Sequence, residues 1–169
     1  TPHLVVMFVL GGLQGLLGWY MVKSGLVDNP DVSQYRLTAH LGTAILVFLY
    51  MLWTVFALLE RTAPQIVSPV FRRAVIGLGI LSSVTVLSGG FVAGLKAGHA
   101  FNTFPLMAGK LIPPGYAVLT PAWRNFFENI PTVQFNHRLL AMTTLVLTLV
   151  FVFRIFRHPK FQAHRLIAV

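Results

Sequence analysis

The sequence predicts an all-α fold, a polytopic membrane helical bundle with four transmembrane helices. Of the 169 residues, 56% are hydrophobic and only 10% are charged, which is more apolar surface than one soluble core of this size buries. The apolar residues are gathered in four runs, each near the ~20 residues that a helix needs to cross the hydrocarbon layer. Most Lys and Arg residues lie between or beside these runs, as in multi-pass membrane proteins.

The runs give the expected helices of one membrane domain over residues 1–169: 4–21, 37–59, 74–95 and 133–153. Small residues stand four apart in the first and third helices, Gly11 with Gly15 and Gly90 with Gly94. This spacing lets two helix backbones approach closely in lipid. Gln14 is a single amide inside the first helix, and we interpret it as an interhelical hydrogen-bonding group rather than a catalytic one.

The long connection over residues 96–132 is rich in Pro, Gly and aromatic residues rather than in the polar residues of a disordered linker. We expect it to fold as a cap on the outer membrane surface. The alternative is an interfacial loop anchored by its aromatic side chains: Phe101, Phe104, Tyr116 and Trp123. Lys and Arg are concentrated on the opposite side, in the second connection and the C-terminal tail, and this bias predicts that side to be cytoplasmic.

Two of the six histidines lie inside predicted helices, His40 in the second and His137 in the fourth. Both helices enter from the outer side, so we expect the two imidazoles at a matched depth of about 5 to 10 Å by helical rise. An ionisable residue within a span is costly and is therefore a functional candidate. A neutral imidazole is a common axial ligand of haem iron, and Arg138 could hold a haem propionate. Alternatively, the histidines hydrogen-bond across helices and Arg138 reaches the interface.

Composition disfavours several other functions. The chain has no cysteine, which excludes disulfides, thiolate metal sites and thiol catalysis. Neither membrane histidine has a second His, Asp or Glu at i+3 or i+4, which argues against zinc or copper. The formal charge of +9 lies beside the spans rather than along one amphipathic face, so we expect lipid headgroups, not nucleic acid, as its partner. The four acidic residues lie outside the spans, so no buried general base is expected: Asp28, Asp31, Glu60 and Glu128.

Four segments, in order, carry a family resemblance: GLQGLLGWYMVKSGL, PDVSQYRLTAHLGTA, LSGGFVAGLKAGHAFNTFPLMAGKLIP and FFENIPTVQFNHRLLAM. Together they resemble the haem A synthases of proteobacteria and mitochondria. The resemblance implies an eight-helix membrane protein of two similar four-helix halves, of which this chain has about the third to sixth helices.

The resemblance also implies roles for the membrane histidines as axial ligands of haem iron. His40 matches the second histidine of the first half, which holds the substrate haem O. His137, followed by Arg138, matches the first histidine of the second half, which holds a haem b cofactor. The family's catalytic glutamate belongs to a Glu-x-x-His-Arg motif on an upstream helix, and Gln134 stands at the corresponding offset before His137. We therefore expect no catalytic residue in this chain, and no activity of this fragment alone.

The implied activity is oxidation of the position-8 methyl group of haem O to a formyl group, for haem A biosynthesis and cytochrome oxidase assembly. Such an oxidoreductase is expected in the bacterial inner membrane, with the mitochondrial inner membrane as the alternative. Implied partners are haem O and haem A, membrane lipid, haem O synthase, cytochrome oxidase assembly proteins and further copies of the chain. Two rival functions are a b-type membrane cytochrome, with one haem clamped between His40 and His137, and a non-enzymatic haem carrier.

Overall fold

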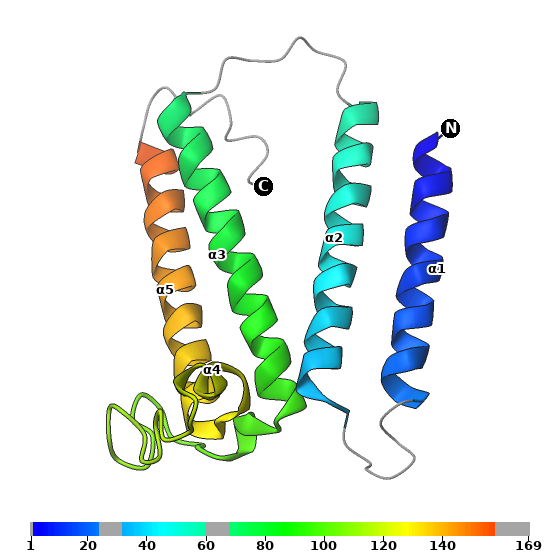
Figure 1. Cartoon of the computed structure of the whole chain (residues 1–169). Helices are drawn as coiled ribbons and strands as arrows, with labels where there is room; N and C mark the ends of the chain where they lie inside the picture. The colour runs from blue at the N-terminus through cyan, green and yellow to red at the C-terminus, as the bar shows by residue number, and fades with distance from the viewer. Residues whose placement is uncertain (1, 24–31, 60–67, 158–169) are drawn as a thin grey trace.

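A computed structural model of the chain describes residues 2–23, 32–59 and 68–157 (Figure 1). Four long helices make up most of the described part: α1 (Pro2–Lys23), α2 (Gln34–Leu59), α3 (Pro69–Gly94) and α5 (Ile130–Arg157). Three short helices lie between α3 and α5: η1 (Ala97–His99), η2 (Ala122–Arg124) and α4 (Asn125–Glu128). The described residues contain no strand beyond one isolated bridge, Met107 with Lys110. The predicted all-α class is confirmed.

The four long helices are long and apolar enough to cross a membrane, as predicted. Many of their large apolar side chains are exposed, for example Phe8 at 83% and Leu58 at 76%. By contrast, the buried apolar residues of the described part are Ala97, Met107 and Val133, all within or next to the connection between α3 and α5. A water-soluble bundle would enclose its apolar helix faces, so these faces require lipid or further helices around them.

The α3 helix begins at Pro69, before the expected start at Ala74. Ser68 caps it, because the Ser68 hydroxyl accepts a hydrogen bond from the Phe71 backbone N–H at 3.2 Å. Proline at the first helical position has its φ already set for a helix. Arg72 and Arg73, which the sequence analysis assigned to a connection, therefore lie in the first turns of the helix.

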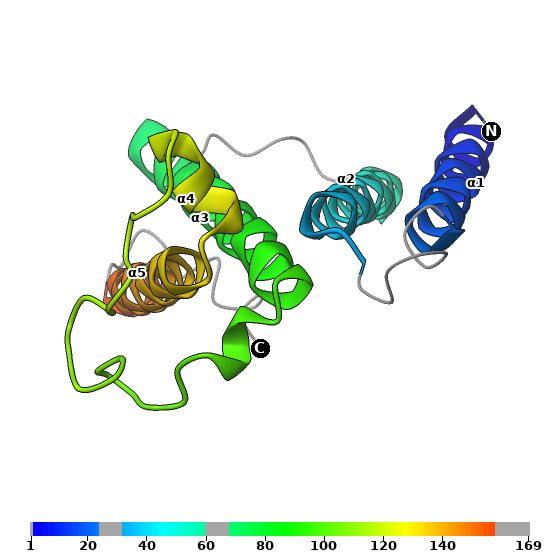
Figure 2. The same cartoon turned by 60° about the horizontal axis from the view of Figure 1, so that its bottom comes forward.

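The long helices stand side by side in chain order and alternate in direction, with α1 next to α2, α2 next to α3, and α3 next to α5 (Figures 1 and 2). Consequently α2 and α5 both begin at the end of the bundle where the connection between α3 and α5 lies (Figure 1). This arrangement brings the early residues of α2 and α5 to the same end of the molecule.

The contact between α2 and α3 depends on two glycines. A Cβ on Gly94 would lie 2.5 Å from the Gln34 Cα, and a Cβ on Gly90 would lie 2.7 Å from the Thr38 hydroxyl oxygen. Neither position can hold a side chain without moving the helices apart, which confirms the packing role predicted for this pair. Gly11 and Gly15 differ, because a Cβ on either would meet nothing within 4 Å in the described residues.

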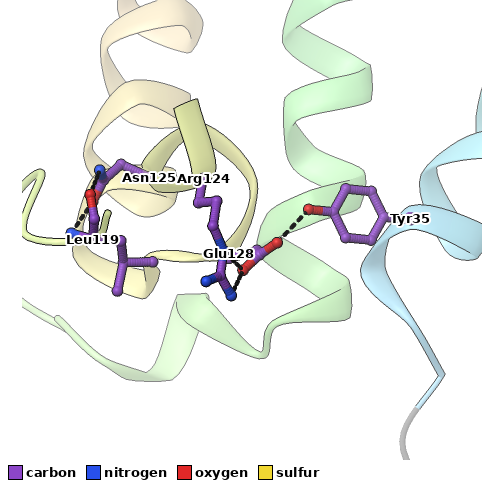
Figure 3. Close-up of polar contacts among 5 residues, drawn as sticks. All are labelled: Tyr35, Leu119, Arg124, Asn125 and Glu128. Atoms are coloured by element: carbon purple, nitrogen blue, oxygen red, sulfur yellow. Dashed lines mark hydrogen bonds and ion pairs between the residues drawn. The ribbon is translucent and has the colours of Figure 1, made fainter. Parts of the chain in front are cut away.

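The connection between α3 and α5 is fixed by buried side-chain amides. Asn125, 2% exposed, donates to the Leu119 carbonyl and accepts from the Leu119 N–H, each at 2.9 Å (Figure 3). It also donates to the Ala122 carbonyl at 2.9 Å. Asn129 donates to the Gly115 carbonyl at 3.1 Å. Satisfied buried amides of this kind order an irregular segment. Its placement on the outer membrane surface stays a prediction.

Candidate functional site

His40 lies on α2 with its imidazole ring against α1. A Cβ on Gly18 would lie 3.1 Å from the His40 Cε1, so the ring occupies the space that a side chain at position 18 would need. The Gln14 amide donates to the His40 carbonyl at 2.8 Å and accepts from the Thr43 hydroxyl at 2.5 Å. Gln14 is therefore an interhelical hydrogen-bonding group, as predicted. The ring nitrogen Nδ1 of His40 is buried and has no hydrogen-bond partner among the described residues.

His137 lies on α5 with its ring against α3 in a similar way. A Cβ on Gly89 would lie 3.2 Å from the His137 Cε1. Here, however, the ring nitrogen Nδ1 is hydrogen-bonded, because it lies 2.7 Å from the Ser88 hydroxyl oxygen. Ser88 was not singled out from the sequence. Its position just before Gly89 and Gly90 fits a small-residue packing segment, and its contact to α5 comes only from the fold.

The structure brings the two histidines to the same end of the bundle but not together. By helical rise of ~1.5 Å per residue, His40 lies about 9 Å from the start of α2, and His137 lies about 10 Å from the start of α5. Between them stands the α2–α3 contact, where Thr38 meets Gly90. His40 thus faces α1 on one side of this contact, and His137 faces α3 at a separate helix pair.

Arg138 binds the connection that covers the start of α5. Its guanidinium donates to the Thr103 carbonyl at 2.7 Å and to the Phe101 carbonyl at 2.6 Å. The Gln134 amide, from the same face of α5, donates to the Phe101 carbonyl at 2.9 Å. Two of the five guanidinium N–H groups of Arg138 therefore donate hydrogen bonds to described residues. The role of Arg138 toward a haem propionate stays a prediction.

A second polar cluster joins α2 to α4 at this end (Figure 3). The Tyr35 hydroxyl donates to one Glu128 carboxylate oxygen at 2.8 Å, and the Arg124 guanidinium donates to the other at 2.7 Å. Hydrogen bonds from Arg124 and then from Tyr35 hold the pKa of Glu128 below its ordinary value. Glu128 in turn raises the pKa of Arg124. This cluster was not predicted, because Tyr35 and Glu128 lie far apart in the sequence.

The donor set suits single axial ligation more than a multidentate metal centre. Within the described ranges, no three His, Cys, Asp or Glu side chains are grouped as a metal site. Haem iron needs only one imidazole nitrogen at an axial position. Each histidine lies partly buried against a glycine that leaves room for its ring, and His40 keeps a buried nitrogen without a partner. The residues present therefore fit haem ligation at two separate places.

Comparison with known proteins decides the family. The model of the family described as "Cytochrome oxidase assembly protein" matches residues 1–169. The chain belongs to this family. Similar proteins include the one named "Heme A synthase" in Nitrosospira multiformis, with 53% identity over 147 residues, which is 85% of this chain and 41% of that protein.

Two further proteins with the same name show comparable similarity. The protein from Nitrosomonas eutropha is 54% identical over 142 residues, which cover 82% of this chain and 40% of that protein. The protein from Parvibaculum lavamentivorans is 49% identical over 146 residues, covering 86% of this chain and 42% of that protein. The chain thus spans about two fifths of the length of these relatives. No solved structure matches the chain.

Proposed function

We propose that this chain is the middle part of a haem A synthase, an eight-helix protein of two four-helix halves that converts haem O to haem A. The proposed reaction would oxidise the position-8 methyl group of haem O to a formyl group by successive hydroxylations and loss of water, a four-electron oxidation whose electrons pass to an external acceptor. The observation that carries the proposal is the pair of histidines, each set against a glycine of a different neighbouring helix at one end of the bundle. Relatives about half identical over most of the chain, all with the same name, support it.

In this proposal the imidazole of His40 would hold the substrate haem O, and the imidazole of His137 would hold a haem b cofactor. Haem b would supply one-electron chemistry when bound. The protein residues orient the rings and exclude water. The helices α1 and α3 hold the imidazoles in place, and Arg138 binds the loop carbonyls of Phe101 and Thr103. Its other N–H groups are suited to a haem carboxylate, since guanidinium binds carboxylates strongly.

The single-haem cytochrome is a weaker candidate than the synthase. One haem held by both histidines would have to lie between His40 and His137, where α2 and α3 meet closely at Thr38 and Gly90. A haem carrier would keep both histidines without catalysing the oxidation, so it is separated from the synthase only by measuring the product. We propose the bacterial inner membrane as the location, with the mitochondrial inner membrane as the alternative, and haem O synthase and oxidase assembly proteins as partners.

The test is haem conversion by the full-length gene product in cells that make haem O but no haem A. Extracted haems are separated by chromatography and identified by mass spectrometry. We expect haem A to form with the wild-type protein and to be lost with His40→Ala. His99→Ala is the matched control, because His99 is an exposed histidine of the short helix η1 rather than of a long helix, and it should leave haem A formation intact. Unchanged haem O with an intact, haem-loaded protein would exclude the synthase.

A further inference from the structure

We propose that Ser88 is a positioning residue that fixes the tautomer of His137, so that Nδ1 carries the proton and Nε2 is left as the iron ligand. This inference rests on the proposed function, because it takes His137 as a haem ligand. It goes beyond that function in naming the side chain on α3 that prepares the ligand and in explaining why the two histidine sites differ.

The hydrogen-bond pattern of Ser88 decides the direction of its contact with the ring. A serine hydroxyl has one proton, and the Ser88 hydroxyl donates it to the Thr85 carbonyl of its own helix at 2.7 Å. With that proton donated to the carbonyl, we assign the 2.7 Å contact between the Ser88 oxygen and the His137 Nδ1 as a hydrogen bond that the ring donates. In a neutral imidazole, an N–H at Nδ1 leaves the lone pair at Nε2.

The position of the ring agrees with this tautomer. The hydrogen bond that joins the ring to α3 is made through Nδ1. A Cβ on Gly89 would lie 3.2 Å from Cε1 and 3.8 Å from each ring nitrogen, so the ring presents Nδ1 to Ser88 and Nε2 on the other side of Cε1. The nitrogen proposed to meet the iron is therefore the one that Ser88 does not contact.

His40 provides an internal contrast. Its Nδ1 is buried without a partner among the described residues, although its ring lies against a glycine in the same manner. Metal-binding histidines usually donate their second N–H to an acceptor, which orients the ring and makes the ligand more basic. A ligand with this support suits a resident cofactor, whereas a ligand without it suits a haem that must arrive and leave. The contrast matches haem b at His137 and haem O at His40.

The test compares variants of the purified full-length protein with its haems bound. Ser88→Ala removes the acceptor, Ser88→Cys weakens it at similar volume, and Ser88→Thr keeps the hydroxyl. Ser83→Ala is the matched control, because the Ser83 hydroxyl donates its hydrogen bond to the Gly79 carbonyl of its own helix, at 2.9 Å, rather than contacting a histidine. Two quantities are measured: the rate at which haem b is lost to an excess of apomyoglobin, and the midpoint potential of haem b.

We expect Ser88→Ala and Ser88→Cys to lose haem b about tenfold faster, the lower end of the effect of removing such a partner. Their midpoint potential should rise, because a less basic imidazole stabilises the ferric state less. Ser88→Thr and Ser83→Ala should match the wild type in both quantities. A purely structural role of Ser88 would leave the potential unchanged. Should Ser88→Ala not accumulate in the membrane, Ser88→Cys decides.

Wild-type values of both quantities in Ser88→Ala, or in Ser88→Cys, would overturn the inference. His137→Ala separates this outcome from a failure of the proposed function. Loss of haem b in His137→Ala with unchanged Ser88 variants refutes the positioning role alone. Retention of haem b in His137→Ala refutes the assignment of His137 as its ligand, and the role of Ser88 with it.

Discussion

The contact between α2 and α3 should be most sensitive to the substitution Gly94→Ala. A Cβ at this position would lie 2.5 Å from the Gln34 Cα, 2.7 Å from its Cβ and 3.2 Å from its backbone nitrogen. Carbon atoms normally approach to about 3.5 to 4.0 Å, so the start of α2 would have to move by about 1 Å. Two of these are backbone atoms at the start of a helix, and the backbone sets the position of the Cβ, so no change of side-chain rotamer can relieve the clash.

Overpacking of this kind costs about 1–3 kcal/mol, which lowers the folding equilibrium constant about 5- to 150-fold. The higher helix propensity of alanine offsets little of this cost, because Gly94 is the last residue of α3. Gly77→Ala is the matched control on the same helix, since a Cβ there meets nothing within 4 Å in the described residues. It should be neutral or stabilising by up to ~1 kcal/mol.

The assay is denaturant unfolding of the purified full-length protein, followed by loss of helical circular dichroism and by haem release. Gly94→Ala should unfold at lower denaturant than the wild type. It should also release the haem at His40 more readily than the haem at His137, because Gln34 and His40 share the first turns of α2. Equal unfolding midpoints for Gly94→Ala, Gly77→Ala and the wild type would refute the close-contact account of the glycines.

Two further predictions concern the polar contacts that hold the connection between α3 and α5. Because the pKa of Glu128 is lowered in the folded protein, its stabilising contribution is present above the ordinary carboxyl pKa and lost as pH falls through the lowered value. Proteolysis of the connection should therefore be faster at acid pH than at neutral pH in the wild type. At neutral pH the Glu128→Gln protein should be cleaved faster than the wild type. Equal cleavage rates of the two proteins at neutral pH would contradict the stabilising role of Glu128. Arg138→Ala removes two charge-assisted hydrogen bonds and should destabilise this segment by about 1.5–3 kcal/mol. The measurement is amide hydrogen exchange around Phe101, which should be faster in the variant. Unchanged exchange would show that these bonds do not stabilise the segment.

The four spans could be predicted from the sequence because apolar runs of membrane length are a local signal. The start of α3 could not be placed from this signal alone, since Arg72 and Arg73 interrupt the apolar run although Ser68 and Pro69 open the helix earlier. The cap at Ser68 indicates a helix start at Pro69, whereas the two arginines indicate a later start. The hydrogen bonds of the cap determine the helix start, because they satisfy backbone N–H groups whatever the hydropathy of the residues in the first turn.

The candidate site was predictable in part. His40 and His137 stood out because imidazoles are rare and costly in apolar helices. Ser88 did not stand out, since its neighbours Gly89 and Gly90 give a packing signal and its contact to His137 joins residues far apart in the chain. The partners of Arg138 are backbone carbonyls of the loop, which no side-chain pattern marks. Sequence thus identified the costly groups, and tertiary structure supplied the residues that position them.

The most direct test of the account is to determine which haems are bound by the full-length protein when each histidine is replaced. Wild type, His40→Ala and His137→Ala are purified from cells that make haem O, and bound haems are identified by mass and counted per protein. The account predicts that His40→Ala loses haem O and keeps haem b, and that His137→Ala loses haem b and keeps haem O. Loss of all haem with either single replacement would show one shared haem and contradict the account.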